Sequence, residues 1–460
     1  MTNTAFSSLN LDARLLGNLP SLGYTHMTPI QEKSLPHILS ESDIIAQGKT
    51  GSGKTATFGL GLLNKLDVNV FHVQSLVLCP TRELADQVAN EFRRLARAIP
   101  NVKVLTLCGG LPFGPQAASI ANGVHIIIGT PGRVEDHLRK GTLRLKTLKT
   151  IVLDEADRMM DMGFQETLDV IIEQIPKKRQ TLLFSATFPE NIRSVAKRVM
   201  NKPIKIHVES IHDSITIKQS FYKVNDNNEV DILRSLLLQK GFESILIFCN
   251  TKTETQRVAN QLITAGFSAL ALHGDFDQRN RTQTLVQFSN RSIQILVATD
   301  VAARGIDIDS LDAVINFHIA NSSNIHLHRI GRTGRAGKTG IAITLFRDKD
   351  TYKVELIKES LEQDITDEPL TVLVEPIPSP PKAAMRTLLI SGGKRQKIRP
   401  GDVLGALTGK NGINGSQVGK INIFNDQTFV AIEHKVTIFA KKKLAEGKIK
   451  GRNFRIRVVK

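Results

Sequence analysis

The sequence predicts an α/β protein with two doubly wound parallel-sheet domains followed by a small C-terminal α+β domain. Short apolar or β-branched runs alternate with longer stretches that lack helix breakers, which is typical of strands buried on both faces of a parallel sheet. The alternation stops near Pro203 and restarts at Ser244. Because the chain has 460 residues, about two to three domains are expected.

The first domain is expected over residues 1–205 and begins with a helical lead-in at residues 1–40. Its predicted strands are Asp43–Ala46, Ser75–Leu78, Val124–Ile128, Thr150–Leu153 and Thr181–Phe184, with candidate helices such as Arg82–Ile99 between them. Each strand runs into a polar motif. Because parallel strands end at the same edge of the sheet, these motifs are expected to gather where α/β proteins bind their ligands.

The first strand is followed by the glycine-rich stretch Gln47–Thr55, which reads Q-G-K-T-G-S-G-K-T. Gly48, Gly53, Lys54 and Thr55 match the pattern G-x-x-x-x-G-K-[ST]. In such a loop the glycines let backbone N–H groups wrap phosphate oxygens, and the next helix adds its positive end. Lys54 would reach the β- and γ-phosphates, and Thr55 would hold Mg²⁺. A glycine-rich turn without a ligand is the alternative, but the strand–loop–helix context favours nucleotide binding.

Two adjacent acids, Asp154 and Glu155, follow the strand Thr150–Leu153. A nucleotide enzyme places its Mg²⁺ carboxylate at such a strand end. Glu155 would then orient or deprotonate the attacking water. Taken alone, two adjacent acids are better explained as the start of a helix. The phosphate loop upstream makes the catalytic interpretation the preferred one.

Tyr24 and Gln31 lie just ahead of the phosphate loop and carry groups suited to a purine. The amide of Gln31 both donates and accepts hydrogen bonds, so it can read an adenine edge. Tyr24 could stack on the base. Without further context, Gln31 fits a surface position at a helix start equally well.

The second domain is expected over residues 216–365, after a polar linker at residues 205–217. Its predicted strands are Ser244–Phe248, Ala269–Leu272, Ile293–Ala298, Ala313–Phe317 and Gly340–Leu345. It lacks a phosphate loop but ends with the motif H-R-I-G-R-T-G-R at residues 328–335. Arginines three residues apart among glycines suit bidentate binding of phosphate, although a basic turn is the alternative.

The net charge of +17 is concentrated near the C-terminus. Residues 376–460 hold 18 Lys or Arg and 4 Asp or Glu, whereas the rest of the chain carries a net charge of only +3. A basic block of this density points to a polyanion such as nucleic acid, rather than to a merely soluble surface. Before it, five prolines in residues 369–381 predict a stiff, extended spacer.

The third domain is expected over residues 384–460. Its predicted strands and helices are Arg386–Ile390, Asp402–Leu407, Gly419–Phe424, Thr428–Ile432, Lys435–Leu444 and Phe454–Val459, in the order β-α-β-β-α-β. This order fits a small RRM-like domain. A basic disordered tail is the alternative, and the regularly spaced apolar residues argue against it.

The cysteines and the apolar runs exclude several classes of protein. Cys79, Cys108 and Cys249 lie far apart and form no C-x-x-C pair, so structural zinc and a disulfide framework are not expected. No run of ~18 apolar residues predicts a transmembrane helix. The N-terminus lacks the features of a signal peptide. We therefore expect a cytoplasmic protein with no disulfides and no membrane partner.

Taken in order, the motifs resemble those of the DEAD-box RNA helicases over about residues 6–345. The resemblance is carried by G-Y with the downstream Gln31, A-Q-G-K-T-G-S-G-K-T, P-T-R-E-L, T-P-G-R, D-E-A-D, S-A-T, A-T-D-V-A-A-R-G-I-D and H-R-I-G-R-T-G-R. These eight motifs in family order make the resemblance specific. It implies two RecA-like domains with ATP and RNA bound across their cleft, and RNA-stimulated ATP hydrolysis coupled to local unwinding of short RNA duplexes.

The resemblance also implies a role for each residue at a matching position. ATP binding would involve Tyr24, Gln31, Gly48, Thr50, Gly51, Ser52, Gly53, Lys54, Thr55, Gly305 and Asp307. The catalytic set would be Lys54, Asp154, Glu155, Arg332 and Arg335, with Mg²⁺ held by Thr55 and Asp154 and with the two arginines acting as fingers from the second domain. The RNA backbone would contact Arg82, Gly110, Thr130, Arg133, Gly274 and Thr299. The residues that would couple the ATP site to the RNA site are Ser185, Thr187 and His328.

The C-terminal segment resembles the RNA-binding domain of one bacterial subfamily, DEAD-box protein A. The resemblance is carried by residues 399–407 and 447–452. It implies binding to a hairpin of 23S ribosomal RNA during assembly of the large ribosomal subunit, so the expected partners are 23S ribosomal RNA and large-subunit precursor particles.

This segment departs from an ordinary RRM in the residues expected to stack on bases. Leu389 and Gln427 stand where aromatic residues are expected, and only Phe429 is aromatic. Recognition is instead expected from basic loops and from the cluster Lys441-Lys442-Lys443.

Two rival function classes remain open on sequence alone. A DNA helicase or translocating ATPase would share the two-domain core, and comparing ATPase stimulation by RNA and by DNA separates it. An ATP-dependent RNA-binding assembly factor without turnover is the second rival. The presence of Lys54, Glu155, Arg332 and Arg335 argues against it. A helicase that acts on RNAs other than 23S ribosomal RNA also remains possible.

Overall fold

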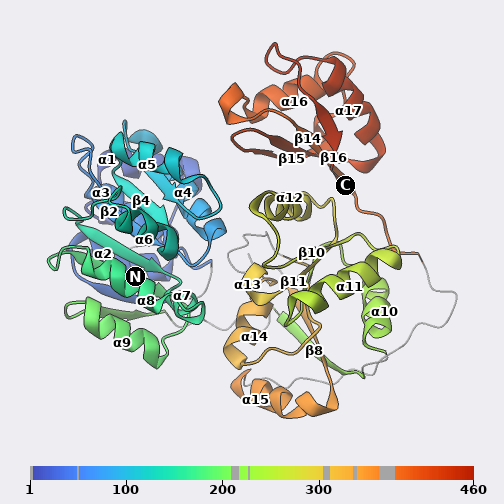
Figure 1. Cartoon of the computed structure of the whole chain (residues 1–460), viewed down its shortest axis with the longest axis horizontal. Helices are drawn as coiled ribbons and strands as arrows, with labels where there is room; N and C mark the ends of the chain where they lie inside the picture. The colour runs from blue at the N-terminus through green and yellow to red at the C-terminus, as the bar shows by residue number, and fades with distance from the viewer. Residues whose placement is uncertain are drawn as a thin grey trace. The chain divides into compact units, whose positions relative to one another are not determined.

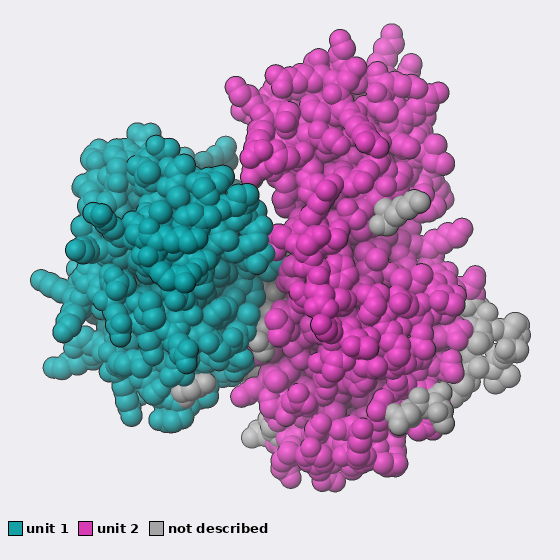
Figure 2. All heavy atoms as spheres, in the orientation of Figure 1, with its two compact units in different colours: residues 1–213, 305–307 teal, residues 214–304, 308–460 magenta. Residues whose placement is uncertain are grey.

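The computed structural model describes residues 4–48, 51–208, 217–225, 228–303, 311–334, 339–361 and 379–459. They form two compact units, with the described residues up to 208 in the first and those from 217 onward in the second (Figure 2). Each unit contains a parallel sheet, and the second unit also contains a small antiparallel sheet near the C-terminus (Figure 1). The predicted fold class is therefore confirmed.

The first unit is built on a seven-stranded sheet in the order β3-β4-β2-β5-β6-β1-β7, with every neighbouring pair parallel. Its strands are β1 Ile44–Gln47, β2 Ser75–Leu78, β3 Val104–Leu107, β4 Ile126–Gly129, β5 Thr150–Asp154, β6 Gln180–Ser185 and β7 Ile204–His207. Because β1, β5 and β6 lie side by side, the loops that follow them meet at one edge of the sheet.

Helices cover both faces of this sheet. They are α1 Ala13–Asn18, α2 Pro29–Leu39, α3 Lys54–Asn64, α4 Arg82–Leu95, α5 Phe113–Ala121, α6 Pro131–Arg139, α7 Ala156–Asp161, α8 Gln165–Glu173 and α9 Glu190–Val199. Successive strand residues enter opposite cores: Ile44 and Ala46 pack with α2, α3 and α4, whereas Ile45 packs with α7, α8 and α9. Burial on both faces explains why these strands read as continuous apolar runs.

Three strands lie outside the runs found in the sequence: β3, β7 and the edge strand β8, Ile217–Lys223. All three are at sheet edges, and each contains polar or partly exposed positions that interrupt the apolar run. In β7, for example, Ile206 is buried while Lys205 and His207 are exposed. The polar stretch 205–217 therefore begins inside the first sheet and ends at the start of β8, and is not a linker throughout.

The second unit contains a six-stranded parallel sheet in the order β10-β11-β9-β12-β13-β8. Its remaining strands are β9 Ile245–Phe248, β10 Ala269–Leu272, β11 Ile295–Ala298, β12 Ala313–Asn316 and β13 Gly340–Phe346. Its helices are α10 Glu229–Lys240, α11 Lys252–Thr264, α12 Gln278–Ser289, α13 Asp300–Ala303, α14 Ser323–Ile330 and α15 Thr351–Leu361. The predicted proline spacer lies outside the described residues, apart from residues 379–381.

The C-terminal domain has the predicted β-α-β-β-α-β order. Its elements are β14 Met385–Ile390, α16 Pro400–Thr408, β15 Val418–Ile423, β16 Thr428–Glu433, α17 Thr437–Glu446 and β17 Ile456–Val458. The strands form an antiparallel sheet in the order β15-β16-β14-β17. Leu388 and Val430 face the two helices, where they pack with Val403 and Leu444.

The other face of this small sheet lies against α12 of the same unit. Leu389, Phe429 and Val459 form an apolar cluster with Val286 of α12. Thr387 on β14 accepts a hydrogen bond from the Asn290 side-chain amide at 3.1 Å, next to the end of α12. The sheet face that carries Leu389 and Phe429 is thus buried by protein.

Two further findings concern the whole described chain. Its helices are all too short or too polar to cross a lipid bilayer. Cys79, Cys108 and Cys249 are buried free thiols. Burial raises the pKa of the Cys108 thiol to about 12, which leaves it protonated and unreactive at neutral pH.

Candidate nucleotide-binding site

The phosphate loop joins β1 to α3, and two of its glycines have left-handed backbones. The φ angle is +86° at Gly51 and +96° at Gly53. A Cβ atom at Gly53 would also lie 2.8 Å from Gln31 Nε2 and 2.9 Å from Thr28 Oγ1. Both backbone conformation and space therefore require glycine at position 53. Thr50, which was also predicted to bind ATP, lies outside the described residues.

Thr28, just before α2, and Gln31, in the first turn of α2, support this loop. The Thr28 hydroxyl donates to the Ser52 backbone carbonyl at 2.7 Å. The side-chain Oε1 of Gln31 accepts from the Thr28 backbone N–H at 2.8 Å. Gln31 is fully buried, so it does not occupy the surface position that its sequence context allowed. Tyr24 is half-buried, and its hydroxyl donates to Glu91 of α4 at 2.7 Å.

Lys54, the first residue of α3, is buried among carboxylates. Its Nζ donates to the Gly48 carbonyl at 2.5 Å. Burial lowers the pKa of Lys54, while the negative charges of Asp154, Glu155 and Asp157 oppose that shift. The loop following β1 and the motif following β5 therefore act on each other electrostatically.

Asp154 ends β5 and is almost completely buried. Burial raises its pKa to about 7, Glu155 adds to the increase, and Lys54 opposes it. Its Oδ1 has no hydrogen-bond partner among the described residues. A buried carboxylate oxygen without a partner is costly in free energy, so this atom is suited to a ligand that brings positive charge.

The donors at this edge fit Mg²⁺ held jointly with phosphate. Mg²⁺ is commonly bound through one or two carboxylates together with substrate phosphates, rather than by an all-protein cage. Asp154 Oδ1 supplies such a carboxylate oxygen, and Thr55 in the first turn of α3 supplies a hydroxyl. Within the described ranges no three His, Cys, Asp or Glu side chains are grouped for a metal.

Glu155 has an unusual backbone for a residue with a side chain. Its φ is +51°, in the left-handed region, where strain is usually tolerated for a functional reason. Its carboxylate accepts from Arg158 Nη1 at 2.6 Å, and the Arg158 side chain is itself buried. Arg158, one turn along the chain, thus fixes the direction of the Glu155 carboxylate.

Asp157 connects this acidic motif to the end of β6. Its Oδ2 accepts from the backbone N–H of Thr187 at 2.9 Å and from the Thr187 hydroxyl at 2.8 Å. The Ser185 hydroxyl accepts from the Asp157 backbone N–H at 3.3 Å. Sequence reasoning placed Ser185 and Thr187 in one motif but gave Asp157 no role, although its position two residues after Glu155 in D-E-A-D is a signal.

The predicted RNA contacts of the first unit come together around the ends of β2, β3 and β4, which are neighbours in the sheet. A Cβ at Gly110 would overlap the guanidinium of Arg82, so the loop after β3 lies directly against that side chain. Arg133 in α6 donates to the Leu111 carbonyl at 3.1 Å. Thr130 caps the start of α6. Two arginines, a glycine loop and a hydroxyl thus share one edge.

In the second unit, Gly274 follows β10 and Thr299 follows the adjacent strand β11. His328 is a half-buried residue of α14, and Arg332 is buried just after that helix. Three other predicted site residues lie outside the described residues: Gly305, Asp307 and Arg335.

Arg329 is buried at the centre of a hydrogen-bond network. It is the first of the three regularly spaced arginines that the sequence suggested for phosphate binding, but its guanidinium is used within the protein. Its Nε and Nη2 bind both carboxylate oxygens of Asp300 at 2.7 Å. Nη1 donates to Asn316 Oδ1 and to the His318 carbonyl, and Nη2 also donates to Asn250 Oδ1. All five donors of the guanidinium are therefore used, and they tie α14 to the ends of β9, β11 and β12.

The three consecutive lysines of α17 do not form one basic patch. Successive helix residues point roughly 100° apart. Lys441 and Lys442 are exposed, and Lys442 lies 3.9 Å from Glu446. Lys443 is half-buried and donates to the Lys410 carbonyl at 2.8 Å. Lys441 and Lys442 are thus the more exposed of the three, and the RNA contact of this cluster stays a prediction.

Three family models match consecutive parts of the chain. Residues 28–195 match the DEAD/DEAH box helicase family, and residues 228–337 match the helicase conserved C-terminal domain. Residues 387–458 match the DbpA RNA binding domain.

Whole-chain comparisons agree with these matches. The chain is 50% identical over 460 residues to the ATP-dependent RNA helicase DbpA of Escherichia coli (strain K12), covering 99% of this chain and 100% of that protein. It is 40% identical over 387 residues to the DEAD-box ATP-dependent RNA helicase CshA of Geobacillus kaustophilus (strain HTA426), covering 84% and 83% of the two chains. Among solved structures, Saccharomyces cerevisiae Dbp5 bound to RNA and ADP BeF3 is similar with a TM-score of 0.72 and 28% identity, covering 80% of this chain and 96% of that one.

We predict that Arg329→Lys destabilises the second unit by about 3–5 kcal/mol, because a single ammonium cannot replace five fixed donors around a buried carboxylate. The melting temperature of the full chain, measured by scanning calorimetry, should fall by roughly 5 to 15 °C for the affected transition. Arg234→Lys is the matched control, since Arg234 is partly exposed and pairs with Asp231 at 3.2 Å. Equal melting curves for the two variants would show that the Arg329 network contributes no special stability.

Proposed function

The chain belongs to the DEAD-box ATP-dependent RNA helicases, similar over its whole length to DbpA, and from this premise we propose that it acts on 23S ribosomal RNA during large-subunit assembly. RNA-stimulated ATP hydrolysis is the activity of this family. The observation that carries the assignment of chemistry is the buried edge where Lys54, Asp154 and Glu155 meet.

In the proposed reaction the phosphate loop binds ATP through residues 48–55, and Lys54 offsets the charge of the β- and γ-phosphates. Thr55 and Asp154 would hold Mg²⁺, which neutralises developing charge on the phosphate oxygens. Tyr24 and Gln31 would recognise adenine. The side-chain amide of Gln31 accepts from the Thr28 backbone N–H and donates to the Gly53 carbonyl, so adenine would have to exchange with one of these partners. Gly305 and Asp307 are assigned to the ribose side of the nucleotide by family position alone.

Glu155 is proposed to position and deprotonate the attacking water. Its carboxylate is held by Arg158 at 2.6 Å, which restricts its direction without filling both oxygens. Arg332 and Arg335 are assigned to the charge that develops in the transition state. Because the phosphate loop belongs to the first unit and Arg332 to the second, turnover would depend on both units.

RNA is proposed to bind residues that follow the strands of both parallel sheets. Arg82, Gly110, Thr130 and Arg133 in the first unit, and Gly274 and Thr299 in the second, would contact backbone phosphates and 2′-hydroxyls. Ser185 and Thr187 would transmit this contact to the ATP site, since Thr187 is bound directly to Asp157, two residues from Glu155. His328 is assigned to the same coupling. By reciprocity, ATP would then tighten RNA binding as RNA promotes hydrolysis.

The C-terminal domain is proposed to direct the helicase to 23S ribosomal RNA. The residues from 376 onward carry a net charge of +14, whereas the helicase portion is nearly neutral. Backbone contacts in the core do not read sequence, so a preference for one RNA has to come from elsewhere. A tethered basic domain raises the concentration of its RNA near the core. Large-subunit precursor particles would be the partners, and the free buried thiols suit work in the cytoplasm.

Glu155→Gln tests the catalytic assignment. The amide should still accept a hydrogen bond from Arg158, so ATP and RNA binding should be retained while RNA-stimulated turnover falls by about 10²- to 10⁴-fold. Steady-state ATPase at saturating RNA, together with binding of a fluorescent nucleotide, separates the two effects. The matched control is Glu166→Gln on α8, where the side chain is exposed. Turnover of Glu155→Gln at the unmodified rate would remove Glu155 from the reaction.

Neutralising Lys441 and Lys442 tests the targeting assignment. The double variant to Gln should raise the concentration of a 23S ribosomal RNA fragment needed for half-maximal ATPase by roughly fivefold, equivalent to about 1 kcal/mol for two phosphate contacts. The maximal rate should stay the same, because the core is unchanged.

Lys177 and Lys178 provide the control, since they are an adjacent exposed pair in the first unit. Their double variant to Gln should leave the half-maximal concentration unaltered. If the two double variants respond alike to the 23S fragment and to an unrelated RNA of equal length, α17 plays no part in targeting.

A further inference from the structure

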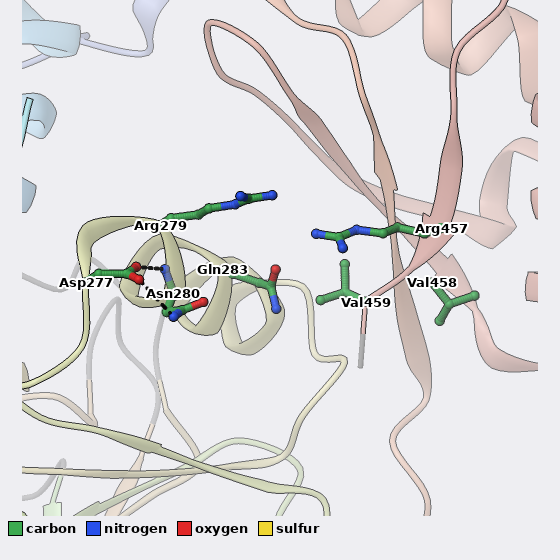
Figure 3. A pocket seen from close by; sticks show the side chains of 7 residues that line it. All are labelled: Asp277, Arg279, Asn280, Gln283, Arg457, Val458 and Val459. Atoms are coloured by element: carbon green, nitrogen blue, oxygen red, sulfur yellow. Dashed lines mark hydrogen bonds between the residues drawn. The ribbon is translucent and has the colours of Figure 1, made fainter.

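A cleft opens between the start of α12 and the last strand of the C-terminal domain. It has a volume of about 610 Å³ and is lined by Asp277, Arg279, Asn280, Gln283, Arg457, Val458 and Val459 (Figure 3). The first four residues belong to the second parallel-sheet domain and the last three to the C-terminal domain. The cleft is therefore built by two domains of one unit.

Two exposed guanidiniums face each other across this cleft. Arg279 extends from α12 and Arg457 extends from β17 toward it (Figure 3). Among the described residues neither guanidinium has a hydrogen bond or an ion pair. Two guanidiniums that point toward each other repel. An anion between them attracts both, and this attraction offsets the repulsion.

The one carboxylate in the lining is hydrogen-bonded within α12, and among the described residues it forms no ion pair with either arginine. Asp277 caps α12, and its two oxygens accept from the backbone N–H of Asn280 at 2.7 Å and from the Asn280 amide at 3.1 Å. Gln283 lies one turn after Arg279 and adds a side-chain amide that can donate to an oxygen of a bound group. The lining thus offers donors to an anion.

The cleft lies at the edge of a sheet face that is otherwise sealed. Arg457 is paired in register with Leu389 of β14, and Leu389 is paired with Phe429 of β16, so the three residues share one face of the sheet. Leu389 and Phe429 are buried against Val286 of α12. In this arrangement bases cannot stack on Phe429, and the charged rim is the part of the face that remains open.

We propose that this cleft binds a phosphodiester of the RNA backbone, held jointly by Arg279 and Arg457. The inference rests on the proposed RNA helicase function and extends it by naming a path for the RNA. Guanidinium forks match the geometry of phosphate oxygens, and a cleft of this size admits the sugars on either side of one phosphate. RNA bound here bridges the C-terminal domain and α12, so it links the targeting domain to the helicase core.

The test measures RNA binding to the full chain by fluorescence anisotropy, with a labelled single-stranded RNA at several salt concentrations. Arg279→Gln and Arg457→Gln should each weaken binding about fivefold and reduce the salt slope by about 0.7. The double variant should lose little more than either single one, because both guanidiniums hold the same phosphate. Arg279→Lys should retain part of the affinity, since it keeps the charge.

The control is Arg234→Gln on α10, which removes one positive charge that is paired with Asp231 outside the cleft. It should leave affinity and salt slope unchanged. Melting curves should match those of the unmodified chain for all variants, because Arg279 and Arg457 are exposed. Wild-type affinity in the double variant would overturn the proposal, as would fully additive losses or an equal loss in the control.

Inorganic phosphate and ATPase measurements separate the remaining outcomes. If inorganic phosphate binds in the cleft but the double variant binds RNA normally, the cleft is only an adventitious anion site and the proposal fails. If the unmodified chain shows no RNA-stimulated ATPase, the proposed function itself fails. If RNA stimulates the ATPase of the unmodified chain but the Arg279 and Arg457 variants bind RNA with wild-type affinity, the proposed function stands and the cleft assignment is wrong.

Discussion

The burial of opposite charges at one edge of the first sheet is the constraint on which the rest of the site depends. Lys54 follows β1 and Asp154 ends β5, two strands that are separated only by β6. Desolvation disfavours the charged form of each group, lowering the pKa of Lys54 and raising that of Asp154. Removing one partner would leave the other charge buried without compensation. The phosphates of bound ATP would pair with Lys54, and the unpartnered Oδ1 of Asp154 is suited to a positively charged ligand.

The second unit repeats this principle with different residues. Arg329 is buried, and its full set of donors is bound by Asp300, Asn316, Asn250 and the His318 carbonyl. This network fixes the end of α14, after which Arg332 follows. The C-terminal domain then attaches through its sheet face, so its exposed charges lie at the rim of that face and on its helices. The hydrogen-bonded network around Arg329 and the apolar contact at α12 thus fix the positions of these elements.

The sequence predicts most of the buried architecture, because strands covered on both faces are continuous apolar runs and the motifs follow directly after them. The edge strands β3, β7 and β8 are not predicted in this way, since polar or partly exposed positions interrupt their apolar runs. The partners of Asp157 and Arg329 come from distant strands, and although the D-E-A-D motif marks the position of Asp157, the local sequence does not identify these partners. The covering of Phe429 by α12 is likewise a tertiary contact. For Gln31 the sequence allowed a surface position at a helix start, whereas the side chain is completely buried.

The central claim is that the charged edge of the first unit hydrolyses ATP in response to RNA. The most direct measurement is the steady-state ATPase rate of the full chain without nucleic acid, with a single-stranded RNA, and with DNA of the same sequence. The account predicts strong stimulation by RNA and little by DNA, because the proposed contacts include 2′-hydroxyls. Equal stimulation by RNA and DNA, or turnover that does not respond to RNA, would contradict it.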